Sequence, residues 1–143
     1  MESLLPYKDI CDADITGIEQ CAEGIKLHIT NVVHDDAYYN VVLALFADSC
    51  DVNYYYYKQY PRCHSIRFRG READFKKMQK YLEKSGTMMI MDNVMDTDRR
   101  RILLVCELRP FKGGGKYRQI IIDIQDLKRA QVLSEEMTGE YTG

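Results

Sequence analysis

The chain has 143 residues, a formal net charge of −2, 45% apolar residues and 29% charged residues. This length and balance are typical of one globular domain that buries its own core without metal or disulfide staples. No apolar stretch approaches the roughly 18 residues that a membrane span needs, and the acidic N-terminus, interrupted by Pro6, is unlike a signal peptide. We therefore expect a single domain over residues 1–143 that is cytoplasmic and has no membrane contact.

The cysteines and histidines show no metal-binding or disulfide pattern. The five cysteines are odd in number and none are spaced as CxxC, whereas a secreted disulfide framework usually has an even count. The three histidines are scattered along the chain, which argues against a structural zinc site. We therefore predict reduced thiols and no metal or other cofactor.

Charge is distributed unevenly along the chain. Residues 1–57 contain 2 Lys/Arg and 10 Asp/Glu, residues 58–118 contain 16 and 7, and residues 119–143 contain 2 and 5. The sequence therefore predicts two oppositely charged surfaces, and either surface could steer a partner of opposite sign.

The first half of the chain has mainly the pattern of β-strands. Apolar and polar residues alternate from Ile25 to Thr30, which indicates a half-buried strand. Before it, Asp14 could cap a short helix that Gly24 ends. After it we predict turns at 34–36 and 48–51 and three further strands, over 38–46, 52–60 and 63–69. The Ala and Leu content of residues 38–46 leaves a helix open there.

The second half is predicted to add two helices. Residues 71–85 place Phe75, Met78 and Leu82 at helical spacing, with lysines on the opposite face. Residues 126–139 have similar spacing between a capping Asp and a terminal Gly. Three strands separate the two helices, over 87–91, 102–108 and 117–124.

We therefore expect an α+β fold, with a single antiparallel sheet of about six or seven strands covered by two helices, in the order ββββαβββα. Runs of strands, rather than strict βαβ alternation, favour antiparallel pairing. The last two strands are predicted to form a hairpin whose tip is Lys112-Gly-Gly-Gly-Lys116.

Basic residues of segment 67–118 form the candidate binding site. Glycines at a hairpin tip let backbone N–H groups approach an anion, and cationic residues beside aromatic ones are typical of nucleic-acid surfaces. Solvated strand edges protected by charge are the alternative interpretation. The candidate residues, for an anion or a macromolecular partner, are Arg67, Arg69, Arg99, Arg100, Arg101, Arg109, Lys112, Lys116 and Arg118, together with Tyr55 and Tyr57.

Four tyrosines follow one another at residues 54–57. In a strand, Tyr54 and Tyr56 face one side of the sheet and Tyr55 and Tyr57 face the other. One pair can lie in the core, and an exposed pair would anchor a protein or a base. A strand buried on both faces is the alternative.

Two acidic patterns could hold a metal ion. The acids over residues 12–23 follow the ligand order of an EF-hand calcium loop, although Glu19 stands where such loops have an apolar residue. Asp92 or Asp98, followed by Glu107 in a strand, parallels the carboxylates that hold Mg²⁺ in PD-(D/E)xK nucleases, although Arg109 replaces the lysine. Solvated acids and a cross-strand Glu–Arg pair explain the same residues without a metal.

Two functions fit these patterns. The first is a small non-enzymatic binding module, such as an inhibitor, an immunity-like protein or a regulator of a partner macromolecule, most simply a protein. The second is binding of nucleic acid or a nucleotide through the basic segment 67–118. A metal-dependent nuclease-like enzyme is a weaker third hypothesis, and a homo-oligomer is left open. Convergence of the basic residues on one surface would favour the second function.

Overall fold

The computed structural model describes residues 4–7, 9–21, 23–60, 63–69, 76, 79–80, 82–83, 86–109 and 116–141. The chain forms seven strands, which are β1 (Asp14–Cys21), β2 (Gly24–His34), β3 (Ala37–Tyr60), β4 (Cys63–Arg69), β5 (Thr87–Asp96), β6 (Arg101–Arg109) and β7 (Lys116–Glu140). Among the described residues, no helix has the length and hydropathy that crossing a membrane requires.

The strands form a closed, six-stranded antiparallel barrel. Neighbouring strands pair in the order β2-β1-β5-β6-β7-β3, and pairing of β2 with β3 closes the ring. The edge of β3 that carries β2 at Ala37–Phe46 carries β4 at Tyr54–Tyr60, so β4 lies outside the ring. Closure leaves few exposed strand edges, which are otherwise sites of unwanted pairing.

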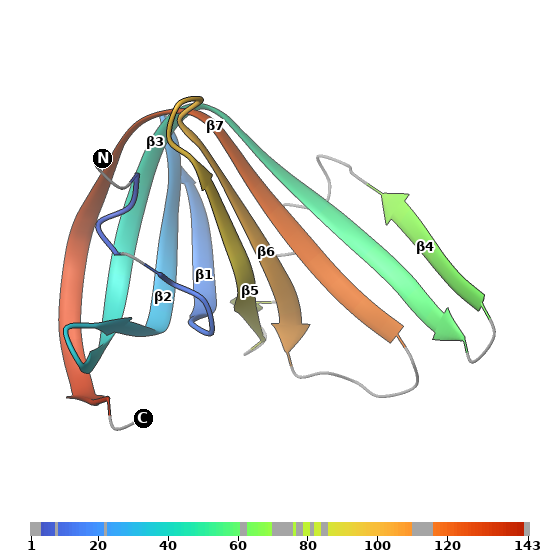
Figure 1. Cartoon of the computed structure of the whole chain (residues 1–143), viewed down its shortest axis with the longest axis horizontal. Helices are drawn as coiled ribbons and strands as arrows, with labels where there is room; N and C mark the ends of the chain where they lie inside the picture. Colours follow the sequence, from blue (N-terminus) through green and yellow to red (C-terminus); the bar gives the residue numbers. More distant parts are fainter. Residues whose placement is uncertain are drawn as a thin grey trace.

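Two unusually long strands, β3 with 24 residues and β7 with 25, determine the shape of the molecule. They pair with each other from Ala37↔Glu140 to Lys58↔Lys116. In Figure 1 they run side by side, arch over the shorter strands and extend beyond them together with β4. The three strands therefore form a ribbon that continues one wall of the barrel.

The core fills the inside of the ring. Residues at alternate positions of a strand face the same side, so one apolar set from each strand can be buried. The buried sets include Ile25, Leu27 and Ile29 of β2, Leu43 and Leu45 of β3, Ile102, Leu104 and Cys106 of β6, and Ile120, Ile122 and Ile124 of β7.

The segment before β1 contributes to the core without forming a strand. Leu4, Leu5, Tyr7 and Ile10 are buried, and the Tyr7 hydroxyl donates a hydrogen bond to Glu135 Oε2 on β7. Burial and this carboxylate raise the pKa of the Tyr7 phenol far above its usual range. Tyr7 therefore stays protonated at neutral pH and anchors the segment to β7.

The α+β prediction is wrong, because the described part of the chain is built of strands and contains no defined helix. Residues 126–139, predicted as the last helix, belong to β7. Register shifts against β3 leave Lys128, Leu133 and Thr138 as extra residues on β7. Each such bulge moves the inward-facing set by one position, so the apolar spacing imitates a helix.

The short helix predicted between Asp14 and Gly24 is also wrong, since these residues form β1 and the first residue of β2. A shift between Ile15 and Gly17 makes Thr16 an extra residue, so the buried Ile15 and Ile18 are three positions apart. Because residues 14–21 form a strand, they cannot form the calcium-binding loop and flanking helix of an EF-hand, so that interpretation is wrong.

The other predictions divide as follows. The strands over 38–46, 63–69 and 102–108 and the turn at 34–36 are confirmed. The turn over 48–51 is wrong, because β3 continues through it. Most of the predicted helix over 71–85, and residues 112–115 of the predicted hairpin tip, lie outside the described residues. Of the first segment, the described Leu82 is buried in the core cluster.

Candidate functional site

The three consecutive arginines at the start of β6 have mainly structural partners. Arg101 donates from Nε and Nη2 to the Asp123 carboxylate on β7, at 2.9 and 2.8 Å. Arg100 has a positive φ of 50°, and its guanidinium donates to the carbonyl oxygens of Leu127 and Lys128. These bonds hold the β5–β6 hairpin against β7 and occupy part of the donor groups of both guanidiniums.

In the Arg101–Asp123 ion pair, the carboxylate is shielded from solvent and the guanidinium is partly exposed. The Asp123 side chain is 12% exposed, whereas that of Arg101 is 43% exposed. Hydrogen bonding to Arg101 lowers the pKa of Asp123 below its usual range. A bidentate salt bridge of this kind is strong and fixes the orientation of both side chains. The pair therefore links β6 to β7.

Arg99 is largely exposed, with 80% of its side chain accessible and Asp96 Oδ2 3.8 Å from Nε. It borders an open depression of about 740 Å³ that Asp98, Asp126 and Lys128 also line. With Arg100 and Arg101, which also line it, the described lining of the depression has four basic and two acidic residues. The structure therefore brings the three predicted arginines to one depression, where two carboxylates reduce their positive charge without cancelling it.

The other predicted basic residues lie on the ribbon, where the backbone register places them. Arg67 and Arg118 are both paired with Tyr56, from β4 and β7 respectively. Arg69 is paired with Tyr54, and Lys116 with Lys58. Directly paired residues share one face of an antiparallel sheet, so the structure brings these four basic residues to one face.

The remaining predicted site residues do not join them. Tyr55 and Tyr57 alternate with Tyr54 and Tyr56 along β3, so they lie on the opposite face of the ribbon. Arg109 ends β6, where it is paired with Thr87 of β5. Lys112 lies outside the described residues.

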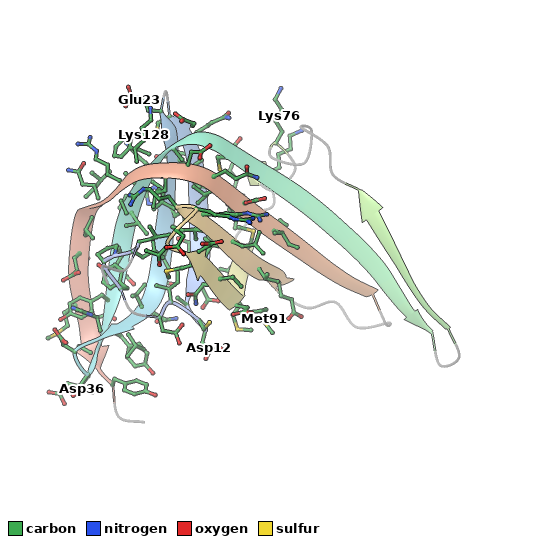
Figure 2. The ribbon with its side chains drawn as sticks, turned by 45° about the horizontal axis from the view of Figure 1, so that its top comes forward. Asp12, Glu23, Asp36, Lys76, Met91 and Lys128 are labelled. Carbon is green, nitrogen blue, oxygen red and sulfur yellow. The ribbon has the colours of Figure 1, made fainter. Side chains whose placement is uncertain are left out.

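A second depression, which the sequence had not indicated, lies at the end of the barrel marked by Asp12 and Asp36 in Figure 2. It has a volume of about 740 Å³. We call it the acidic depression; its lining residues are Asp9, Cys11 and Asp12 of the N-terminal segment, Asn31 and Val33 of β2, Tyr38 of β3, and Tyr141.

Backbone conformation and hydrogen bonds fix three of the residues that line the acidic depression. Asp12 and Asn31 have positive φ values of 69° and 62°, a conformation that Asp and Asn tolerate better than other residues with a side chain. Asp9 Oδ1 accepts hydrogen bonds from Cys11 N at 2.8 Å and Asn93 Nδ2 at 3.0 Å. These donors lower the pKa of Asp9, so its carboxylate is charged at neutral pH.

The rim of the acidic depression is aromatic and negatively charged. Tyr38 and Tyr141 meet edge to face, with ring centroids 5.4 Å apart, and Tyr141 N donates to the carbonyl of Asp36. Asp35 and Asp36 form the β2–β3 turn with φ values of 47° and 61°, as a two-residue type I′ turn requires. Both are exposed, so they extend the negative charge of the depression.

This arrangement suits a cation better than it suits catalysis. The described residues that line the acidic depression include no Lys or Arg, and tyrosine rings attract ammonium and guanidinium groups. Burial and the neighbouring Asp9 raise the pKa of the Cys11 thiol, which disfavours the nucleophilic thiolate. Within the described residues, no three His, Cys, Asp or Glu side chains are grouped so that they could hold a metal ion.

The sequence contained part of the signal for this site. The acidic bias of residues 1–57 indicated a negative surface, but not the approach of Tyr141 to Asp36, which lie 105 positions apart in the printed sequence. No protein-family model matches the sequence, and no curated protein or solved structure is significantly similar to the chain. Function is therefore inferred from the geometry of this chain.

Proposed function

We propose that the protein is a non-enzymatic binding module that blocks or regulates a partner protein by docking a cationic surface of that partner. The observation that carries this proposal is the acidic depression, where exposed carboxylates and a tyrosine pair meet, with no Lys or Arg among the lining residues that the structure describes. Aromatic residues beside complementary charge are typical anchors of protein interfaces.

The charge layout supports attraction over a distance as well as contact. Asp9, Asp12, Asp35 and Asp36 are all exposed and lie on the N-terminal segment and the β2–β3 turn. Several like charges at one end of a small protein accelerate association with an oppositely charged surface, and salt screens the effect. A partner rich in Arg or Lys therefore fits better than an acidic or apolar one.

Shifted titratable groups elsewhere in the described chain have structural explanations, which supports binding over catalysis. Asp123 is paired with Arg101, and Lys128 with Asp48 at 3.0 Å. Burial alone raises the pKa of Cys106 to about 12. Catalytic groups are usually perturbed in an open cleft, whereas these groups are perturbed by the contacts that hold strands together.

A cytoplasmic location belongs to the same proposal. The described cysteines Cys11, Cys21 and Cys106 are free thiols. Free thiols persist in a reducing compartment. Quantitative thiol labelling of protein purified without reductant would test the location, because an intramolecular disulfide in the purified material would argue against it.

The docking surface can be tested by neutralising it without straining the backbone. Asp12→Asn, Asp35→Asn and Asp36→Asn remove three charges, and Asn tolerates the same positive φ. The matched control removes three charges at the opposite end of the barrel, with Glu23→Gln, Asp98→Asn and Asp126→Asn; Asp126 also has a positive φ, of 55°. Both variants have the same net charge.

The probe is a fluorescein-labelled Arg-Gly repeat peptide, titrated by fluorescence anisotropy at low salt. Three surface carboxylates at roughly 0.5 kcal/mol each correspond to about tenfold weaker binding for the first variant. The control variant should bind like the wild type. Equal losses in both variants would show attraction by net charge only and would contradict a localised docking surface.

A further inference from the structure

One face of the β3–β4–β7 ribbon changes from apolar to cationic as the ribbon leaves the barrel. Ile124, Ile122 and Ile120 of β7 are completely buried on the inner face. Arg118 and Lys116 continue the same alternation and therefore lie on the same face. The wall that encloses the core continues beyond the shorter strands (Figure 1), and along it the buried isoleucine positions of β7 are followed by cationic positions.

The register across the three strands collects this charge into rows. The first row pairs Ile120 with Tyr54 and Tyr54 with Arg69, and the next pairs Arg118 with Tyr56 and Tyr56 with Arg67. The last row joins Lys116, Lys58 and Ser65. These three rows, which we call the cationic face, contain five Lys or Arg, two tyrosines and no Asp or Glu.

The opposite face of the same rows has a different composition. Tyr55 is paired with Gln119 and Phe68, and Tyr57 with Tyr117 and Ile66. Because no charged residue lies in these rows, the ribbon separates its residues into an uncharged aromatic face and the cationic face. Charge scattered only to protect strand edges would not be sorted in this way.

We propose that the cationic face binds single-stranded nucleic acid. Neighbouring strands are about 4.8 Å apart and alternate residues about 7 Å apart, so the five cationic residues occupy neighbouring backbone positions on three strands, with Tyr54 and Tyr56 on the middle strand. Single-strand binders combine basic residues for the phosphates with aromatic residues on which bases stack. This surface is separate from the acidic depression, so either proposal can fail while the other holds.

The number of cationic residues sets the expected salt dependence. Neutralising five phosphates of a single strand gives a slope of about −3.5 in log K against log salt. Binding of oligo-dT should therefore weaken about a hundredfold between about 50 and 200 mM salt. The acidic depression predicts no affinity for oligo-dT.

Binding of fluorescein-labelled oligo-dT by the full chain, followed by anisotropy, provides the first arm of the test. Arg67→Gln with Arg118→Gln should weaken binding at least tenfold, whereas the charge-matched Arg99→Gln with Lys128→Gln should leave it within about twofold. Urea unfolding of each variant checks that loss of affinity is not loss of fold. A wild type that does not bind oligo-dT, or equal losses in both variants, would overturn the proposal.

Two further arms identify what the cationic face recognises. Tyr54→Leu with Tyr56→Leu should weaken oligo-dT binding about tenfold and leave binding of inorganic polyphosphate unchanged, because bases stack on aromatic rings and polyphosphate has no base. Polyphosphate bound as tightly as oligo-dT would mean recognition of phosphate charge alone. An oligo-Glu peptide bound more tightly than oligo-dT would identify an acidic protein segment as the ligand. Either of these results contradicts the proposal.

Discussion

Gly24 lies where the barrel closes, and its replacement by Ala tests that closure. It is the first residue of β2 and is paired with Cys21 of β1 and Phe46 of β3. A Cβ atom at this position would lie 1.8 Å from the carbonyl oxygen of Leu45 and 2.8 Å from its carbonyl carbon. The obstacle is backbone, so no side-chain rotation can relieve it.

The size of the effect follows from the displacement. Contacts of a Cβ atom below 3.0 Å are essentially never seen, so the strands must separate by more than an ångström at this point. That movement weakens two or three ladder hydrogen bonds, at about 1 kcal/mol each, and loosens the packing of Ile25 and Leu45. We expect Gly24→Ala to lower the free energy of unfolding by about 3 kcal/mol and Tm by roughly 10 °C.

Urea unfolding followed by far-UV circular dichroism measures the change, with Gly139→Ala as the control. Gly139 lies on β7, and a Cβ atom there would have no heavy atom within 4 Å. The control should therefore remain within about 0.5 kcal/mol of the wild type. A Gly24→Ala protein as stable as the wild type would refute the close approach of β2 and β3, and with it the closed ring.

Three other predictions test single contacts. Asp123→Asn should destabilise the protein by about 1–2 kcal/mol at pH 7, discounted for the partial exposure of Arg101. Because the folded pKa of Asp123 is lowered, its contribution is present above the unfolded value and is lost as pH falls; urea unfolding of both proteins should show the difference shrinking below about pH 4. Tyr7→Phe removes the hydrogen bond to Glu135 and should cost about 1 kcal/mol, with faster amide exchange in residues 4–13; unchanged exchange would contradict the anchoring role. Cys106, with a pKa of about 12 and no exposed surface, should resist iodoacetamide in the native protein and react only in denaturant, as read by peptide mass spectrometry.

The sequence pattern succeeded where strands are regular and failed where they contain bulges. Ile25, Leu27 and Ile29 keep a strict period of two and were predicted as a strand, which β2 confirms. On β7 the buried or half-buried Leu127, Ala130 and Val132 are three and then two positions apart, because Lys128 is an extra residue in the ladder. A periodicity argument cannot distinguish a bulged strand from a helix.

The candidate site was hard to predict because its residues contact partners that are distant in the sequence. Asp48 was interpreted as the start of a turn because Asp favours turns, yet it lies in β3 and pairs with Lys128. Nothing local to Asp48 reveals that partner. The sign of the N-terminal charge was readable from composition, whereas the acidic depression needed Tyr141 to be brought back to the β2–β3 turn.

The location of the docking surface can be measured directly by titrating isotope-labelled protein with the Arg-Gly repeat peptide and following backbone amide shifts by NMR. We predict shifts concentrated at residues 9–12, 31–38 and 141, which surround the acidic depression. Residues 97–101 and 126–128, around the mixed-charge depression, should not move. Shifts confined to those two segments, or spread evenly over all exposed acids, would contradict the proposed docking surface.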